Sequence, residues 1–93
     1  MENARMLIFM EDLSTYFQNK LKNNVSVISK YTYEIEIIFP NREYNIDKLI
    51  KYLEEFLISE ANLKLNNYII SLTNEIKISF KLTNKIIKLL KMD

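Results

Sequence analysis

The side chains that most often perform acid–base or nucleophilic chemistry are missing from this chain. Its 93 residues include no histidine, no cysteine and no glycine. Without histidine and cysteine, the commonest general base and the usual ligands of zinc are both missing. Without glycine, the phosphate-binding loops of P-loop and dinucleotide-binding proteins cannot form. We therefore expect a protein that is not an enzyme and that needs no cofactor.

Two carboxylates are the strongest remaining candidates for a catalytic or metal-binding pair. Glu34 and Glu36 would extend from the same side of one strand, roughly 7 Å apart by the rise of a strand. The sequence offers no third metal ligand beside these two glutamates, such as an Asp-x-Asp motif would supply. We therefore expect these two side chains to form the solvated face of a strand, with no metal site.

Positive charge gathers toward the end of the sequence, although the net charge of the whole chain is only +1. The candidate phosphate contacts are Lys77, Lys81, Lys85, Lys88 and Lys91. Lysines along one strand face and one side of a terminal helix could bind the phosphates of a nucleic acid. They would give little base-specific recognition, because arginine makes most bidentate contacts to guanine. The alternative is that they only keep the terminal helix soluble.

Tyrosine is abundant, and it combines apolar area with a polar tip in a way that is typical of protein interfaces. The chain has six tyrosines and five phenylalanines. Tyr31 and Tyr33, beside Lys30, are the place where nucleic-acid bases could stack on aromatic rings. The alternative is that both tyrosines are half-buried residues of a sheet.

Apolar residues at three- and four-residue steps predict three helices, over residues 4–22, 46–60 and about 83–91. Asn45 is well suited to cap the second of these helices. Because the chain has no glycine, we expect asparagine to occupy the turn positions that need a positive φ.

Alternating apolar and polar residues predict strands within residues 25–39 and 68–82. One straight strand over residues 25–39 would be ~50 Å long, which is too long for a domain of this size. The first segment must therefore turn or bend, and we place this turn or bend at residues 29–32. The second segment is expected to turn at Thr73 and Asn74, as a hairpin.

The order α-β-β-α-β-β-α predicts one α+β domain over residues 1–93, with a four-stranded antiparallel sheet and helices packed on one face. Residues 34–39 and 75–80 resemble each other, which suggests an internal duplication of an αββ unit. Chance similarity is the alternative, because the chain is so rich in isoleucine, lysine and asparagine.

The composition is that of a globular protein, with 48% hydrophobic and 27% charged residues. The lack of cysteine favours a reducing compartment, since small secreted domains usually need disulfides. No apolar run approaches the ~18 residues of a membrane span, and the start of the chain does not resemble a signal peptide. We therefore expect a cytoplasmic protein with no membrane contact.

These observations predict a non-catalytic interaction module with a protein partner, such as a small adaptor or inhibitor encoded by a phage or plasmid. The alternative is a small nucleic-acid-binding protein that uses the C-terminal lysines. We also expect a homodimer, because the core is thin and an open sheet has unpaired edges. In addition, Leu7, Ile8 and Ile58 fall outside the apolar stripes of the helices.

Overall fold

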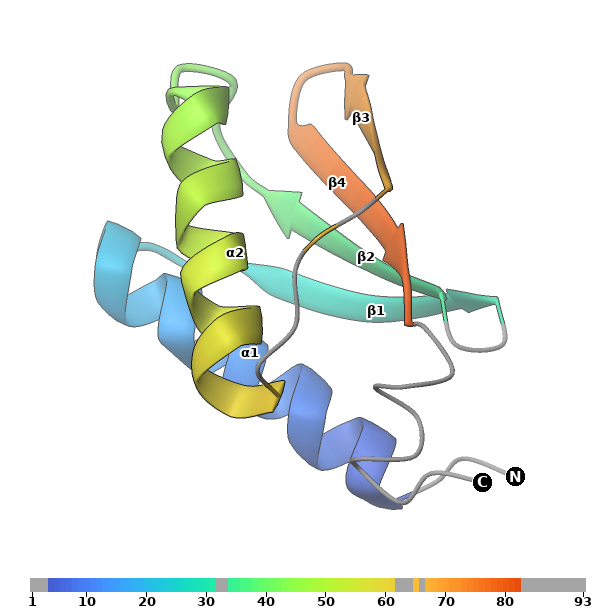
Figure 1. The fold of residues 1–93 in the computed structure, drawn as a ribbon. Helices are drawn as coiled ribbons and strands as arrows, with labels where there is room; N and C mark the ends of the chain where they lie inside the picture. Colours follow the sequence, from blue (N-terminus) through green and yellow to red (C-terminus); the bar gives the residue numbers. More distant parts are fainter. Residues whose placement is uncertain (1–3, 32–33, 62–64, 66, 83–93) are drawn as a thin grey trace.

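The computed structural model describes residues 4–31, 34–61, 65 and 67–82. Within these residues the chain forms two helices and a four-stranded sheet (Figure 1). In chain order the elements are α1 (Ala4–Leu21), β1 (Ser26–Tyr31), β2 (Glu34–Phe39), α2 (Ile46–Ala61), β3 (Tyr68–Leu72) and β4 (Ile76–Lys81). The helix predicted over about residues 83–91 lies outside the described residues.

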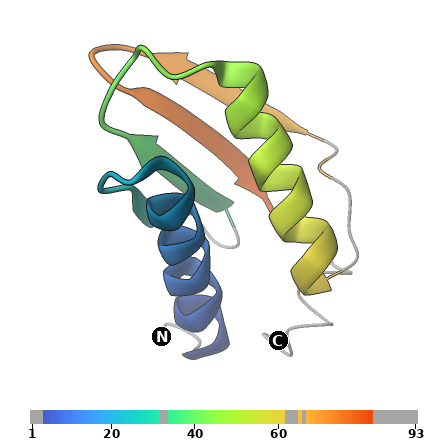
Figure 2. The ribbon, with the colours of Figure 1, turned by 90° about the vertical axis from the view of Figure 1, so that its left-hand side faces the viewer.

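The four strands form one antiparallel sheet in the order β1-β2-β4-β3. Both helices pack on the same face, and in the described part of the chain the opposite face has no helix over it (Figure 1 and Figure 2). The predicted α+β domain with helices on one face of a four-stranded antiparallel sheet is therefore confirmed. β2 and β4 are the central strands, and β1 and β3 are the edges.

Each half of the chain forms a helix followed by a hairpin, as a repeated αββ unit requires. When residues 34–39 are aligned with 75–80, Ile37 and Ile78 are equivalent, and these two residues lie opposite each other where β2 pairs with β4. A local twofold axis through this pair would exchange β2 with β4 and β1 with β3. The sheet order is thus the one that two αββ units produce when they join through their second strands; common ancestry of the two halves stays a prediction.

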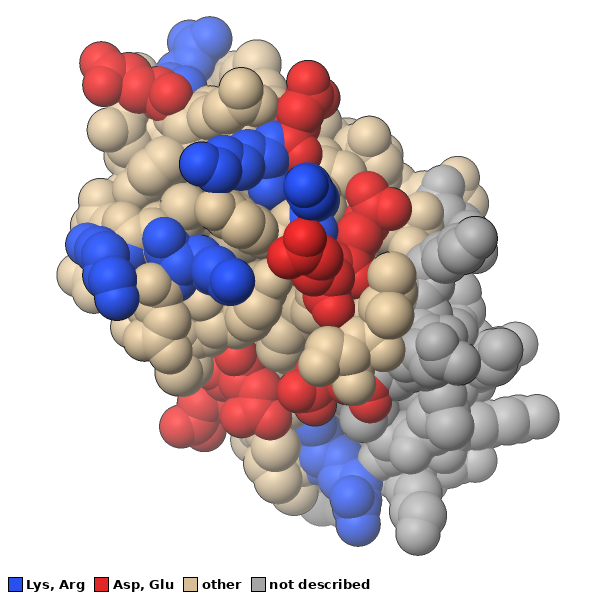
Figure 3. Space-filling model, turned by 60° about the vertical axis from the view of Figure 1, so that its left-hand side comes forward, with Lys and Arg blue, Asp and Glu red and all other residues tan. Residues whose placement is uncertain are grey.

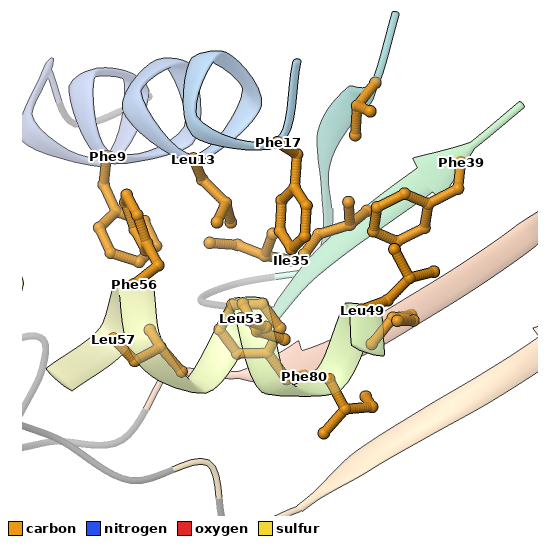
Figure 4. Packing of buried hydrophobic residues seen from close by; sticks show 14 of the residues in the cluster. Phe9, Leu13, Phe17, Ile35, Phe39, Leu49, Leu53, Phe56, Leu57 and Phe80 are labelled. Carbon is orange, nitrogen blue, oxygen red and sulfur yellow. The ribbon is translucent and has the colours of Figure 1, made fainter. Parts of the chain in front are cut away.

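The core lies between the helices and the sheet (Figure 4). The helices contribute the predicted apolar stripes, with Leu53 of α2 fully buried. The sheet contributes alternate residues of its central strands: Ile35, Ile37 and Phe39 of β2 and Ile76, Ile78 and Phe80 of β4. Aromatic rings join the layers: the ring centroids of Phe17 and Phe39 lie 5.0 Å apart, between α1 and β2. Those of Phe9 and Phe56 lie 5.8 Å apart, between α1 and α2.

The residue directly after the first helix has a positive φ. That residue is Lys22, with φ of 56°, and its N–H donates to the carbonyl of Gln18 at 2.8 Å. The prediction that asparagine would take such positions is wrong here, because the left-handed position falls directly after Leu21, the last helical residue. Asn23 has another role, since its Oδ1 accepts the N–H of Asn24 at 2.8 Å.

The second helix begins as predicted, with Asn45 as its cap. The Oδ1 of Asn45 accepts the N–H of Lys48 at 3.2 Å, and its carbonyl accepts the N–H of Leu49 at 3.1 Å. The bond to Lys48 satisfies a donor that the first turn of a helix would otherwise leave unpaired, and the bond to Leu49 is the first regular backbone bond of the helix.

Of the turn or bend predicted at residues 29–32, residues 29–31 belong to β1, and residue 32 lies outside the described residues. β1 continues to Tyr31, which lies opposite Glu34, and the register shifts between Ser29 and Tyr31. An unshifted register would bring residue 31 opposite residue 33, which leaves one residue for the reversal. The extra residue of this β-bulge places residue 31 opposite residue 34, so two residues are available for the reversal. A bulge of this kind cannot be predicted from the alternation of apolar and polar residues.

Candidate interaction surface

The two candidate lysines that the structure describes lie on β4, on the face of the sheet without helices. Lys77 and Lys81 alternate with buried core residues, and Lys77 is half-buried whereas Lys81 is exposed. The two lysines share one strand face, as predicted, and a role in binding stays a prediction. Lys85, Lys88 and Lys91 lie outside the described residues.

Of the predicted stacking site at Tyr31 and Tyr33, the structure describes only the backbone of Tyr31 and the neighbouring Lys30. Tyr31 is the last residue of β1 and lies opposite Glu34 of β2. The side chain of Tyr31 and the whole of Tyr33 lie outside the described residues, so the stacking site stays a prediction. Lys30 is described, and its Nζ lies 3.6 Å from Oε2 of Glu36. This lysine is therefore already paired with a carboxylate of the same chain.

We call the face of the sheet without helices the open face. Its described side chains come mainly from alternate residues of the four strands: Ser26, Ile28, Lys30, Glu34, Glu36, Ile38, Ile69, Ser71, Lys77, Ser79 and Lys81. Lysines and glutamates are interleaved on it, and Lys81 lies directly opposite Glu34 in the register. Three lysines and two glutamates leave this face with a formal charge of +1, which is weak for a phosphate-binding surface.

Glu36 is buried, and the expectation that it would form part of a solvated strand face is wrong. Its Oε2 accepts a hydrogen bond from Ser79 Oγ at 3.1 Å, and it is also the oxygen nearest to Lys30. Glu36 is on a central strand, so cross-strand neighbours cover it on both sides. Glu34 is half-buried. Among the described residues, no cluster of three or more metal-ligating side chains occurs.

The two edges of the sheet differ in how well they are protected. β1 carries a bulge and the charged side chain of Lys30, two features that discourage the pairing of a further strand. The carbonyl of Val25, just before β1, also accepts a hydrogen bond from Ser14 Oγ of α1 at 2.7 Å. β3 pairs with β4 over its whole length without a register shift, and it contains no charged residue.

β3 exposes apolar side chains on both faces of the sheet. Ile69 is 68% exposed on the open face, whereas Tyr68 and Leu72, on the helical side, are 43% and 47% exposed. An uncharged apolar edge strand of this kind is a template for pairing with another strand. We call Tyr68–Leu72, with the backbone groups that it directs away from β4, the β3 edge.

The backbone groups that the β3 edge presents follow from the hydrogen-bond pattern of its hairpin. The N–H of Thr73 donates to the carbonyl of Glu75 at 3.1 Å. Because hydrogen-bonded pairs alternate along an antiparallel ladder, Ser71 and Ile69 direct their N–H and C=O groups toward β4. The N–H and C=O groups of the alternate residues therefore point away from the sheet; these residues are Tyr68, Ile70 and Leu72.

The helical side carries mixed charge and an aromatic cluster. Basic and acidic side chains are intermixed there (Figure 3). The Nζ of Lys20 lies 5.5 Å from the ring centroid of Tyr16 and 5.4 Å from that of Tyr52. The Tyr16 hydroxyl is buried and has no hydrogen-bond partner among the described residues. Burial, followed by the charges of Glu55 and Tyr52, raises the pKa of Tyr16 above its ordinary value.

Comparison with models of known protein families gives no match to this chain. Comparisons with curated protein sequences and with solved structures give none either. In the described part of the chain, neither helix has the length and apolar character that a membrane span needs.

The β3 edge is the feature that the sequence analysis missed. A signal for it was present, because Tyr68, Ile69 and Ile70 are three apolar residues in a row within a stretch that has no charge. A half-buried strand should alternate apolar and polar residues. Apolar residues on both faces of an edge strand are instead typical of a surface that another chain covers.

Proposed function

We propose that this protein is a non-catalytic interaction module that binds another protein by adding an extended segment to the β3 edge. The observation that carries the proposal is the coincidence, on one strand, of outward backbone groups and exposed apolar side chains. In strand addition, main-chain hydrogen bonds supply affinity and alternate side chains supply specificity.

The β3 edge also sets the chemistry of the segment that it would bind. On the helical side, Tyr68 and Leu72 favour apolar side chains, and on the open face Ile69 does the same. A charge placed directly opposite these residues would lose water without gaining a partner, because β3 itself carries no charge. The expected segment is therefore extended, apolar and uncharged over about five residues, the length of β3.

A small adaptor or inhibitor suits this mode of binding, because covering a strand-forming segment of a partner needs no reactive group. The composition, rich in isoleucine, lysine and asparagine, supports an origin in an AT-rich phage or plasmid. The lack of cysteine supports action in the cytoplasm.

The test compares three forms of the protein in affinity capture from host extract treated with nuclease. The wild type is compared with Leu72→Lys, which alters the β3 edge, and with Ile28→Lys, which alters an equally exposed residue at the β1 side. Leu72 is 47% exposed and Ile28 is 42% exposed, so the two substitutions are matched. We expect a captured protein to be lost with Leu72→Lys and kept with Ile28→Lys. Capture that survives Leu72→Lys would contradict the proposal.

The nucleic-acid alternative is supported by one observation, the shared face of Lys77 and Lys81. Against it, Glu34 lies opposite Lys81, and Lys30 is paired with Glu36. Carboxylates at these positions would repel phosphates that approach the lysines. We therefore rank this function second.

A further inference from the structure

Taking the proposed function as its premise, we infer that in the isolated protein the strand added to the β3 edge is β3 of a second copy of this chain, antiparallel about a twofold axis at Ile70. The outward-pointing residues Tyr68, Ile70 and Leu72 are spaced symmetrically about Ile70. An antiparallel partner must place its own outward-pointing residues opposite these. Pairing about Ile70 satisfies this condition at every outward position at once.

In this arrangement the exposed side chains of the β3 edge cover one another. Ile70 lies opposite Ile70 of the second copy, and Tyr68 lies opposite Leu72 of the second copy. The latter pair joins an aromatic and an aliphatic side chain, both nearly half exposed in one copy, and such cross-strand pairs are favourable. On the open face, Ile69 lies diagonally across the axis from Ile69 of the second copy, so the most exposed isoleucine of β3 is also covered.

The charges of the sheet permit this contact between identical surfaces. β3 has no charged residue, so no charges of β3 itself meet across the axis. The nearest lysines of the open face are on β4, and three strand spacings would separate the two β4 strands by ~14 Å. That separation exceeds the Debye length of ~8 Å at physiological ionic strength. A second copy therefore meets complementary apolar groups and little repulsion.

The other edge does not offer an equivalent contact. Self-pairing through β1 would have to accommodate the bulge between Ser29 and Tyr31 and the charged side chain of Lys30. Pairing through β3 instead produces one continuous eight-stranded sheet, twice the four strands of one copy, with the helices of both copies on one side. The open faces of the two copies then form one surface.

Sedimentation equilibrium over a wide concentration range tests the inference. We expect the wild type to approach twice 11.2 kDa as its concentration rises. Leu72→Lys and Ile69→Lys should each weaken the dimer by about tenfold or more, since the axis places every substitution in the interface twice. Ile28→Lys is the matched control and should dimerise like the wild type. Circular dichroism confirms that each variant is folded.

Amide hydrogen exchange of the wild type gives a second measurement that needs no variant. The N–H groups of Tyr68, Ile70 and Leu72 point away from the sheet in one copy, so they should become protected as the protein concentration rises. A wild type that stays at 11.2 kDa, or a dimer that both β3 variants leave intact, would overturn the inference. If the wild type is monomeric while capture of another protein still depends on Leu72, the second-copy inference fails and the proposed function stands.

Discussion

Replacing Leu53 by alanine tests whether α2 holds the helices and the sheet together. Leu53 is 0% exposed and lies near the middle of α2, facing the core side chains of α1 and of the sheet (Figure 4). The truncation removes buried methyl groups and leaves a cavity that packed neighbours on two sides cannot fill. Fully enclosed leucines of this kind lose ~2.7–5 kcal/mol of stability. A domain of 93 residues is stable by roughly 5–14 kcal/mol, so the expected loss is a large share of the total.

Equilibrium urea denaturation at one fixed protein concentration measures this loss as a lower midpoint with an unchanged slope. Ile58→Ala is the matched control, because Ile58 lies on the same helix but is 49% exposed. The control should cost less than ~1 kcal/mol. If Leu53→Ala lowered the free energy of unfolding as little as Ile58→Ala, the conclusion that Leu53 lies on the buried side of α2 would be wrong.

Three further predictions follow from single features of the structure. Lys22→Gly should stabilise the protein by ~0.5–1 kcal/mol, because glycine adopts a positive φ without steric cost; thermal denaturation would show no such gain for the control Lys22→Ala. Stability of the wild type should fall as the pH rises above ~10, since the raised pKa keeps Tyr16 protonated in the folded state while the unfolded state loses its proton. Tyr16→Phe should flatten this dependence, and an unchanged profile would contradict it. In electrophoresis at physiological ionic strength we expect no shift of short DNA duplexes; a shift that Lys77→Glu with Lys81→Glu abolishes would instead favour the nucleic-acid function.

The sequence predicts a helix or strand of this fold well where the pattern of a few neighbouring residues determines which side chains are buried. Leu53 lies on a stripe whose helical period is visible within a few residues, and Ile78 lies in an alternating run. Asn45 could be assigned as a cap because its side chain bonds a backbone group three residues later. Each of these features depends on short-range geometry, which the order of residue types records directly.

Features that depend on the pairing of distant segments could not be predicted in this way. Lys22 takes the left-handed position because of where α1 ends, and the β1 bulge arises from the register with β2. Glu36 is buried because β2 pairs with β4 at the centre of the sheet, and β3 is an edge strand because, among the described strands, it pairs on one side only. Alternation shows that a strand has two faces, but it does not show which strand forms an edge.

The hydrogen bond between Glu36 and Ser79 lies in the pairing of β2 with β4, and this pairing also places β3 at the edge of the sheet. Ser79 Oγ donates to Glu36 Oε2 across the pair of central strands, which belong to different αββ units. A one-residue slip of β2 against β4 would turn one strand over and carry the carboxylate into the apolar core. A buried unpaired charge is far more costly than the present bond is favourable, so this contact selects the register more than it stabilises the fold. The same pairing of β2 with β4 places β3 at the edge of the sheet, where we propose that Tyr68–Leu72 accepts another strand.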